Sequence, residues 1–347
     1  MGLFADNPRE TMARPRLMPD NFTLMLVATV ILASVLPCRG LAAQIANVVT
    51  NIAIGLLFFL HGAKLSRQAL VAGITHWRLH LLVFAFTFIS FPLLGWALQP
   101  LLAPLVTPEL YLGVLFMCAL PATVQSSIAF VSMARGNVSA AVCSASLSSL
   151  LGIFLTPLLV RLLLDAHGGS DGQSTLDAIV KICVQLLLPF VAGQLLRPVI
   201  GHWVDRHKGK LKFVDQGSIL LVVYTAFSAA VIEGLWRETP ILSLVGLVFI
   251  CATLLTLVLL ATRYSARLLG MSKEDEITVV FCGSKKSLAT GVPMAKVLFA
   301  GSTMGPVLLP IMLFHQIQLM VCAVLAQRYA KREAVAPVTP VVAPLPK

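Results

Sequence analysis

Charged residues are scarce in this sequence: Asp, Glu, Lys and Arg together make up 12% of its 347 residues. A soluble globular protein carries roughly 25% charged residues. Aromatic residues are also few, at 7%, whereas apolar residues reach 58%. This composition excludes an ordinary soluble domain and predicts an integral membrane protein.

Acidic residues are missing from the middle of the apolar segments, since Glu109, Asp177 and Glu276 all fall at segment ends. Six of the seven cysteines lie inside apolar segments without the spacing of a metal site, which is typical of small buried residues. The net charge of +11 is spread over short connections rather than gathered in one patch. We therefore expect no metal centre, no cofactor and no nucleic-acid partner.

Ten apolar segments are long enough to cross a lipid bilayer, because a spanning helix needs about 20 residues. They cover residues 20–37, 43–63, 79–98, 110–133, 137–163, 177–199, 214–235, 240–262, 276–299 and 303–328. One side carries 19 Lys and Arg, counting Arg197 and Arg328 at segment ends, and the other carries two, or four with Arg161 and Lys181 at segment ends. By the positive-inside rule, both termini should face the cytoplasm. We expect a multi-pass protein of the bacterial inner membrane.

The ten segments divide into two groups of five after residue 165. An odd number of crossings gives the two groups opposite orientations, so we predict an all-α fold of two inverted repeats, residues 20–165 and 166–330. Residues 1–19 should form a cytoplasmic N-terminal segment. The Pro-rich residues 331–347 should form a disordered tail.

The fourth segment of each half contains a polar interruption, at residues 120–127 and at residues 282–287. The second interruption carries the adjacent Lys285 and Lys286. A charge at bilayer depth is costly and usually marks a functional site. Broken backbone is tolerated there only where protein or a water-filled cavity covers it. Paired interruptions of this kind predict a binding site near the bilayer midplane.

Lys285 and Lys286 determine the charge of this predicted site. Without a carboxylate nearby, their ammonium groups need an anion, backbone carbonyls or the loss of a proton. We expect an anionic substrate; its predicted ligands are Lys285, Lys286, Ser287, Gln125, His315 and Gln318. Carbonyls freed at the helix ends could hold an ion together with nearby hydroxyls. The candidates for that ion site are Ser126, Ser127, Ser144, Ser148 and Ser284.

Hydrogen bonding between helices is an equal alternative for the pairs Ser144–Ser148 and His315–Gln318. The members of each pair share a helix face, and polar residues commonly join membrane helices.

Residues 281–295, FCGSKKSLATGVPMA, resemble the signature of the SBF-like branch of the bile acid:sodium symporter family. Residues 121–130, 134–137 and 314–318 add to the resemblance, which covers about residues 20–330. It implies a core domain of segments 3–5 and 8–10, with the fourth and ninth helices broken and crossing. The remaining segments would form a panel domain. Alternating access would then move the two domains around a substrate held between them.

The sequence departs from this family at the positions that bind sodium. Bile acid carriers have an acidic residue where this chain has Phe281, and a Gln-Asn pair where it has Lys285 and Lys286. One interpretation is that a lysine ammonium occupies a sodium position. The carrier would then be independent of sodium or coupled to protons. The hydroxyls of Ser126 and Ser127 remain, so the coupling ion is left open between sodium and a proton.

We therefore predict a secondary transporter for a small organic anion in the lipid bilayer. The alternative is a regulatory membrane protein that does not transport, because the branch includes members linked to calcium homeostasis. A channel is less favoured, because we find no ring-forming repeat or voltage sensor. Ser287 beside a lysine imitates a Ser–Lys catalytic pair, but no catalytic domain accompanies it, and we predict no enzyme activity.

Overall fold

A computed structural model describes residues 21–64, 76–165, 183–232, 234–299 and 304–331, and the regular elements in these ranges are helices. Seven of the described helices are long and apolar enough to cross a membrane. The chain is therefore an integral, multi-pass membrane protein. The predictions for residues 1–19, for the connection between the two halves and for residues 332–347 concern parts of the chain outside these ranges.

The elements of the first half coincide closely with the first five predicted segments. In chain order they are α1 (Asn21–Val35), α2 (Gly40–Lys64), α4 (Trp77–Ala85), η2 (Phe86–Ser90), α5 (Phe91–Ala97), α6 (Gln99–Leu102), η3 (Ala103–Leu105), α7 (Pro108–Ala119), α8 (Gln125–Met133) and α9 (Val138–Asp165). The third predicted segment is continuous but contains a π-helical stretch, η2. The fourth is divided between α7 and α8.

The second half follows the other five segments. Its elements are η4 (Cys183–Leu187), α11 (Leu188–Arg206), α12 (Lys208–Ile232), α13 (Leu235–Glu238), α14 (Ile241–Leu268), α15 (Lys273–Gly283), α16 (Leu288–Leu298) and α17 (Met304–Ala330). The ninth predicted segment is divided between α15 and α16. Three helices, α11, α12 and α14, run further than predicted because they continue through basic residues that hydropathy assigned to connections.

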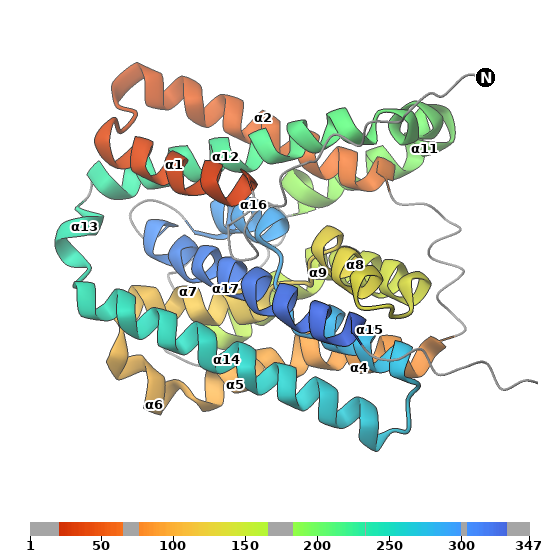
Figure 1. Ribbon diagram of the computed structural model, residues 1–347. Helices are drawn as coiled ribbons and strands as arrows, with labels where there is room; N and C mark the ends of the chain where they lie inside the picture. The colour runs from red at the N-terminus through yellow and green to blue at the C-terminus, as the bar shows by residue number, and fades with distance from the viewer. Residues whose placement is uncertain (1–20, 65–75, 166–182, 233, 300–303, 332–347) are drawn as a thin grey trace, which may run out of the picture.

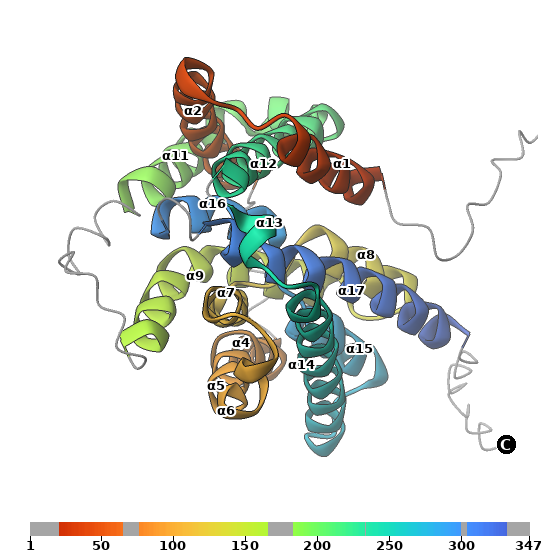
Figure 2. The same ribbon diagram turned by 90° about the vertical axis from the view of Figure 1, so that its left-hand side faces the viewer.

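The helices form two layers (Figures 1 and 2). Helices α1, α2, α11 and α12 lie together at the top of both views, and the other long helices lie below them. Contacts between the layers involve α12 with α16 and α17. We call the upper group the four-helix layer and the lower group the main layer. The main layer contains both divided segments.

Two glycines allow α2 and α11 to pack with their backbones in contact. A Cβ at Gly62 would collide with the backbone carbonyl of Phe190. A Cβ at Gly193 would collide in the same way with the backbone of Phe59 and Ala63. Small residues at such crossings are how membrane helices associate closely, because lipid provides no hydrophobic force between them.

We expect Gly193→Ala to lower the stability of the four-helix layer. The added methyl group meets backbone atoms, which cannot rotate away, and overpacking of this kind costs about 1–3 kcal/mol. Thermal unfolding in detergent measures the loss. Gly55→Ala on α2 is the matched control, since its Cβ would meet nothing within 4 Å. Equal melting temperatures for the two variants would contradict the proposed backbone contact.

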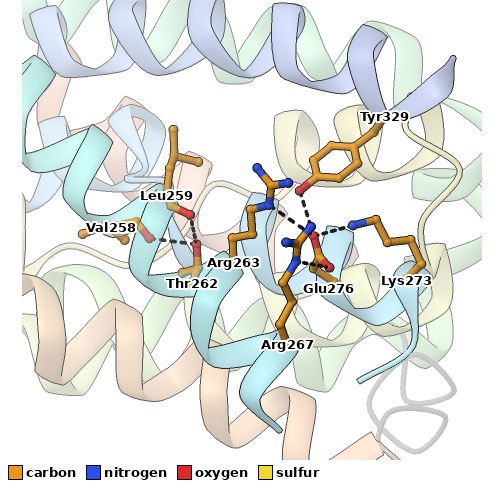
Figure 3. A network of polar contacts seen from close by, with 8 residues as sticks. All are labelled: Val258, Leu259, Thr262, Arg263, Arg267, Lys273, Glu276 and Tyr329. Atoms are coloured by element: carbon orange, nitrogen blue, oxygen red, sulfur yellow. Dashed lines mark hydrogen bonds and ion pairs between the residues drawn. The ribbon is translucent and has the colours of Figure 1, made fainter. Parts of the chain in front are cut away.

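An ionic network around Glu276 lies at one end of the main layer (Figure 3). The carboxylate of Glu276 on α15 is buried and accepts hydrogen bonds from Lys273 (2.6 Å), Arg267 (3.1 Å) and the Tyr329 hydroxyl (3.1 Å). Arg263 lies 3.7 Å from the same carboxylate. The network ties the end of α14 and the end of α17 to the start of α15. It thereby holds the first half of the divided segment α15–α16 in place.

Candidate functional site

The first interruption separates α7, which ends at Ala119, from α8, which begins at Gln125. Proline at position 121 explains the stop, because it disfavours a helical conformation at the residue before it. Leu120 is accordingly extended, with φ −73° and ψ 153°. The last carbonyls of α7 are left without helical partners.

The second interruption separates α15, which ends at Gly283, from α16, which begins at Leu288. Ser287 is the N-cap of α16, and its hydroxyl accepts a hydrogen bond from the Thr290 amide at 3.3 Å. The extended backbone of Ser287, with φ −87° and ψ 110°, re-aims the chain between the two helices. Lys285 and Lys286 lie in the stretch between the helices.

The two interruptions lie against each other. The Ser287 amide donates a hydrogen bond to the Pro121 carbonyl at 2.9 Å. The Ser127 hydroxyl donates to the Phe281 carbonyl at 3.1 Å. Protein groups rather than lipid thus satisfy backbone atoms that the broken helices leave free, as a position within a membrane requires.

The ammonium group of Lys286 is enclosed by three backbone carbonyls. Its Nζ lies 2.8 Å from Thr87 O, 2.7 Å from Cys118 O and 2.8 Å from Leu120 O. An ammonium has three N–H donors, so this arrangement satisfies all of them. The ring of Phe91 adds a cation–π contact, with its centroid 4.2 Å from Nζ. The side chain is 0% exposed, and among the described residues no carboxylate lies within ion-pair distance of it.

The sequence explains why these three carbonyls are available. Cys118 and Leu120 lie at the end of α7, where carbonyls have no helical partners and the helix dipole is negative. At the end of η2 the Phe91 amide bonds to Phe86 O, five residues back. In the same register Thr87 O would accept from residue 92, but Pro92 has no N–H. The carbonyl of Thr87 is therefore free to accept from Lys286.

Lys285 occupies a different and more aromatic environment. Its Nζ donates to Ser126 O at 3.1 Å and lies 3.8 Å from the centre of the Phe130 ring and 5.7 Å from that of Phe281. Phe281, at the position where the resemblance implies an acidic residue in bile acid carriers, stacks on Phe130 with centroids 5.9 Å apart. The two lysines therefore differ: one is enclosed by carbonyls, the other mainly by aromatic faces.

Gln318 on α17 fixes the backbone between the lysines and Ser287. Its Oε1 accepts from the Lys286 amide and its Nε2 donates to the Lys286 carbonyl, both at 2.9 Å. The same Nε2 lies 2.9 Å from Nδ1 of His315. The structure thus brings Gln318 and His315 to the interruption. Their observed partners are protein groups.

The five predicted ion ligands and the predicted substrate ligand Gln125 separate into two groups. Ser126, Ser127 and Ser148 lie at the first interruption: the first two are within 3.2 Å of the Thr123 hydroxyl, and Ser148 accepts from the Ala122 amide at 3.0 Å. The other residues point elsewhere. Ser284 donates to Val280 O on its own helix, Ser144 pairs with His80, and Gln125 is exposed.

Five residues of the site were not identified from the sequence: Thr87, Cys118 and Leu120, which supply carbonyls, and Phe91 and Phe130, which supply ring faces. Backbone carbonyls carry no signature in side-chain chemistry. One signal was available, since Pro92 within an apolar segment must leave a carbonyl four or five residues earlier without its usual partner.

Comparison with known proteins shows the family to which the sequence is related. Residues 20–331 match the model of the SBF-like CPA transporter family. An uncharacterized protein of Pseudomonas aeruginosa is 72% identical over 92% of this chain and 96% of its own length. YfeH of Escherichia coli, named as a candidate symporter, is 56% identical over 90% of this chain and 93% of its own length.

A more distant relative is an animal protein. The sodium/bile acid cotransporter 7 of Rattus norvegicus is 30% identical over 80% of this chain and 82% of its own length. The family-model match, over residues 20–331, extends across both interruptions and all described helices. The chain therefore belongs to the SBF-like CPA transporter family, within the bile acid:sodium symporter family.

Proposed function

We propose that this protein is a secondary transporter that moves a small organic anion by alternating access without sodium. The observation that carries the proposal is the Lys286 ammonium, which three carbonyls enclose at distances of 2.7–2.8 Å. Rings of backbone carbonyls are a usual means of holding a monovalent cation in a membrane protein. Here a tethered ammonium takes the place of a diffusible ion.

In this proposal the ten segments form two inverted repeats. The interruption of each repeat falls in its fourth segment, and Gln125–Ser126–Ser127 precede Lys285–Lys286–Ser287 by 160 residues. The four-helix layer corresponds to the panel domain and the main layer to the core domain. Transport would move one layer against the other, with the substrate between them.

The sequence predicts an anionic substrate from Lys285 and Lys286, but the structure changes the support for it. Both lysine ammonium groups bond to protein carbonyls, so in this proposal they hold the two interruptions together rather than contact the substrate. Support for an anion comes instead from relatives named as sodium/bile acid cotransporters. The cationic residues Arg39 and Lys296, which lie outside the two interruptions, add to it. We also place the chain in the bacterial inner membrane with both termini cytoplasmic, because 19 Lys and Arg lie on that side.

Uptake into proteoliposomes tests the proposal. We expect purified protein to accumulate members of a mixture of bile acids and small carboxylates, read by mass spectrometry, equally in sodium and in choline buffers. Protein-free liposomes and Lys286→Ala protein are the controls. Uptake that follows a sodium gradient would contradict sodium independence. Absence of uptake under sodium, proton and potassium gradients would contradict transport and favour the regulatory alternative.

A further inference from the structure

A cavity of about 420 Å³ lies at the end of the four-helix layer where α2 begins and α12 ends. These two helix ends are at the left in Figure 1. Sites for small molecules range from roughly 300 to 1,000 Å³. The walls come from the α1–α2 connection, from α2 and from α12. Ala43, Ala229 and Ile232 make part of the wall apolar.

Two hydrogen bonds fix the connection that forms the rim of this cavity. The Tyr224 hydroxyl of α12 donates to Leu36 O at 2.8 Å. The indole N–H of Trp236 donates to the Ser34 hydroxyl at 3.0 Å. Because α1 is held at its end in this way, the next residues, Cys38 and Arg39, are positioned against the cavity.

One cationic side chain lines the cavity, and a second, from the other layer, bonds to a residue of its wall. Arg39 lines it, and the wall residue Asn47 accepts a 2.7 Å hydrogen bond from Lys296 Nζ on α16 of the main layer. Neither cation forms an ion pair within the part of the chain that the structure describes. The nine residues that line the cavity include no Asp or Glu. Glu233, which follows Ile232 in sequence, lies outside the described residues.

A buried hydroxyl on the cavity wall has no partner in the described structure. Ser228 is 2% exposed, and its Oγ makes no hydrogen bond. By contrast, Ser218 and Thr225 of the same helix bond to the carbonyls of Val214 and Leu221, one turn back. Buried polar groups are nearly always paired, so an unpaired hydroxyl facing a cavity indicates a missing ligand or water.

We propose that this cavity binds the carboxylate of a small organic anion. Arg39 and Lys296 compensate its charge, Ser228 donates a hydrogen bond to it, and the apolar wall receives its hydrocarbon part. The proposal rests on the transport function above. It assigns the substrate a site away from the two interruptions, one of which contains Lys285 and Lys286. Because Lys296 belongs to one layer and Arg39 to the other, a bound anion joins the layers that transport must move.

Cys38 provides a reporter for this site. It is partly exposed, whereas five other free cysteines are buried: Cys118, Cys143, Cys251, Cys282 and Cys322. In full-length protein with Cys183→Ala, we expect a negatively charged methanethiosulfonate to modify Cys38 faster than a positively charged one. The rate of each reagent with Cys38 is divided by its rate with free mercaptoethanol, which corrects for the intrinsic reactivity of the reagent. A nearby cation should change this ratio about fivefold, and Arg39→Gln or Lys296→Gln should reduce it.

Protection by a ligand completes the test. Benzoate should slow the modification of Cys38, and the neutral benzamide should not. Ser228→Ala should weaken protection without lowering the melting temperature, and Ser218→Ala on the same helix should leave protection unchanged. Equal corrected rates for the two reagents would overturn the proposal, as would failure of benzoate to protect Cys38. A preference for the negatively charged reagent that emerges only in Glu233→Gln protein would also overturn it, because Glu233 would then neutralise the cations in the wild type.

Transport measured on the same preparations separates this site from the function. Protection without uptake in proteoliposomes would support the anion site and contradict the carrier. Uptake without protection would support the carrier and overturn this site.

Discussion

Replacing Lys286 with alanine should make the stability of the protein depend on sodium, whereas the stability of the wild type should not. The substitution leaves three carbonyl oxygens directed at one vacated point. Removing one partner of a buried charged contact typically costs about 3–5 kcal/mol. A sodium ion that occupies the vacated point only in the folded state would restore about 2.7 kcal/mol at 100 times its dissociation constant.

Unfolding of the detergent-solubilised protein measures this effect, in sodium chloride and in choline chloride at equal ionic strength. Lys285→Ala is the matched control. Its Nζ bonds to one carbonyl and otherwise contacts aromatic rings, so its removal creates no comparable oxygen cage. We expect Lys285→Ala to be destabilised equally in both salts.

Two results would contradict the cation-replacement interpretation. One is a folded Lys286→Ala protein whose melting temperature is the same in both salts. The other is a wild type that sodium stabilises as strongly as the variant. Should Lys286→Ala not fold, Lys286→Gln keeps two of the three N–H donors and provides an intermediate case. Sodium should then stabilise it less than it would the fully vacated site.

The positions of the helices could be predicted from the sequence because the membrane imposes a length and a composition on each segment. The two interruptions could be predicted because Pro121 and the lysine pair are incompatible with an uninterrupted lipid-facing helix. These are local properties of the chain. They required no knowledge of which segments become neighbours.

The partners of the two lysines could not be predicted in the same way. The sequence allowed an anion, carbonyls or loss of a proton for both, and it did not distinguish Lys285 from Lys286. The distinction comes from tertiary structure. The carbonyls that accept hydrogen bonds from the Lys286 ammonium belong to η2 and to the end of α7, 166 to 199 residues earlier in the chain. Gln125 shows the converse case, since it adjoins Ser126 in sequence yet is exposed.

The second large effect is expected at the other end of α15. Glu276→Ala should lower the free energy of unfolding by about 3 kcal/mol, as expected when a buried carboxylate is removed from paired cations. The Glu276 side chain is 5% exposed, while those of Arg263, Arg267 and Lys273 are 38–51% exposed. Each ion pair alone would be weak because water screens it. The loss is large because one buried carboxylate is the acceptor for three helices.

Glu274→Ala separates this network from the helix dipole. Glu274 and Glu276 both lie in the first turn of α15, where a negative charge favours the helix by about 0.3–1 kcal/mol. Glu274 is exposed, so water screens its interactions and its replacement should cost about that smaller amount. Denaturant unfolding of both variants measures the difference. Equal losses would show that α15 is stabilised by charge at its start; a loss concentrated at Glu276 would show that the network anchors the divided segment that carries Lys285 and Lys286.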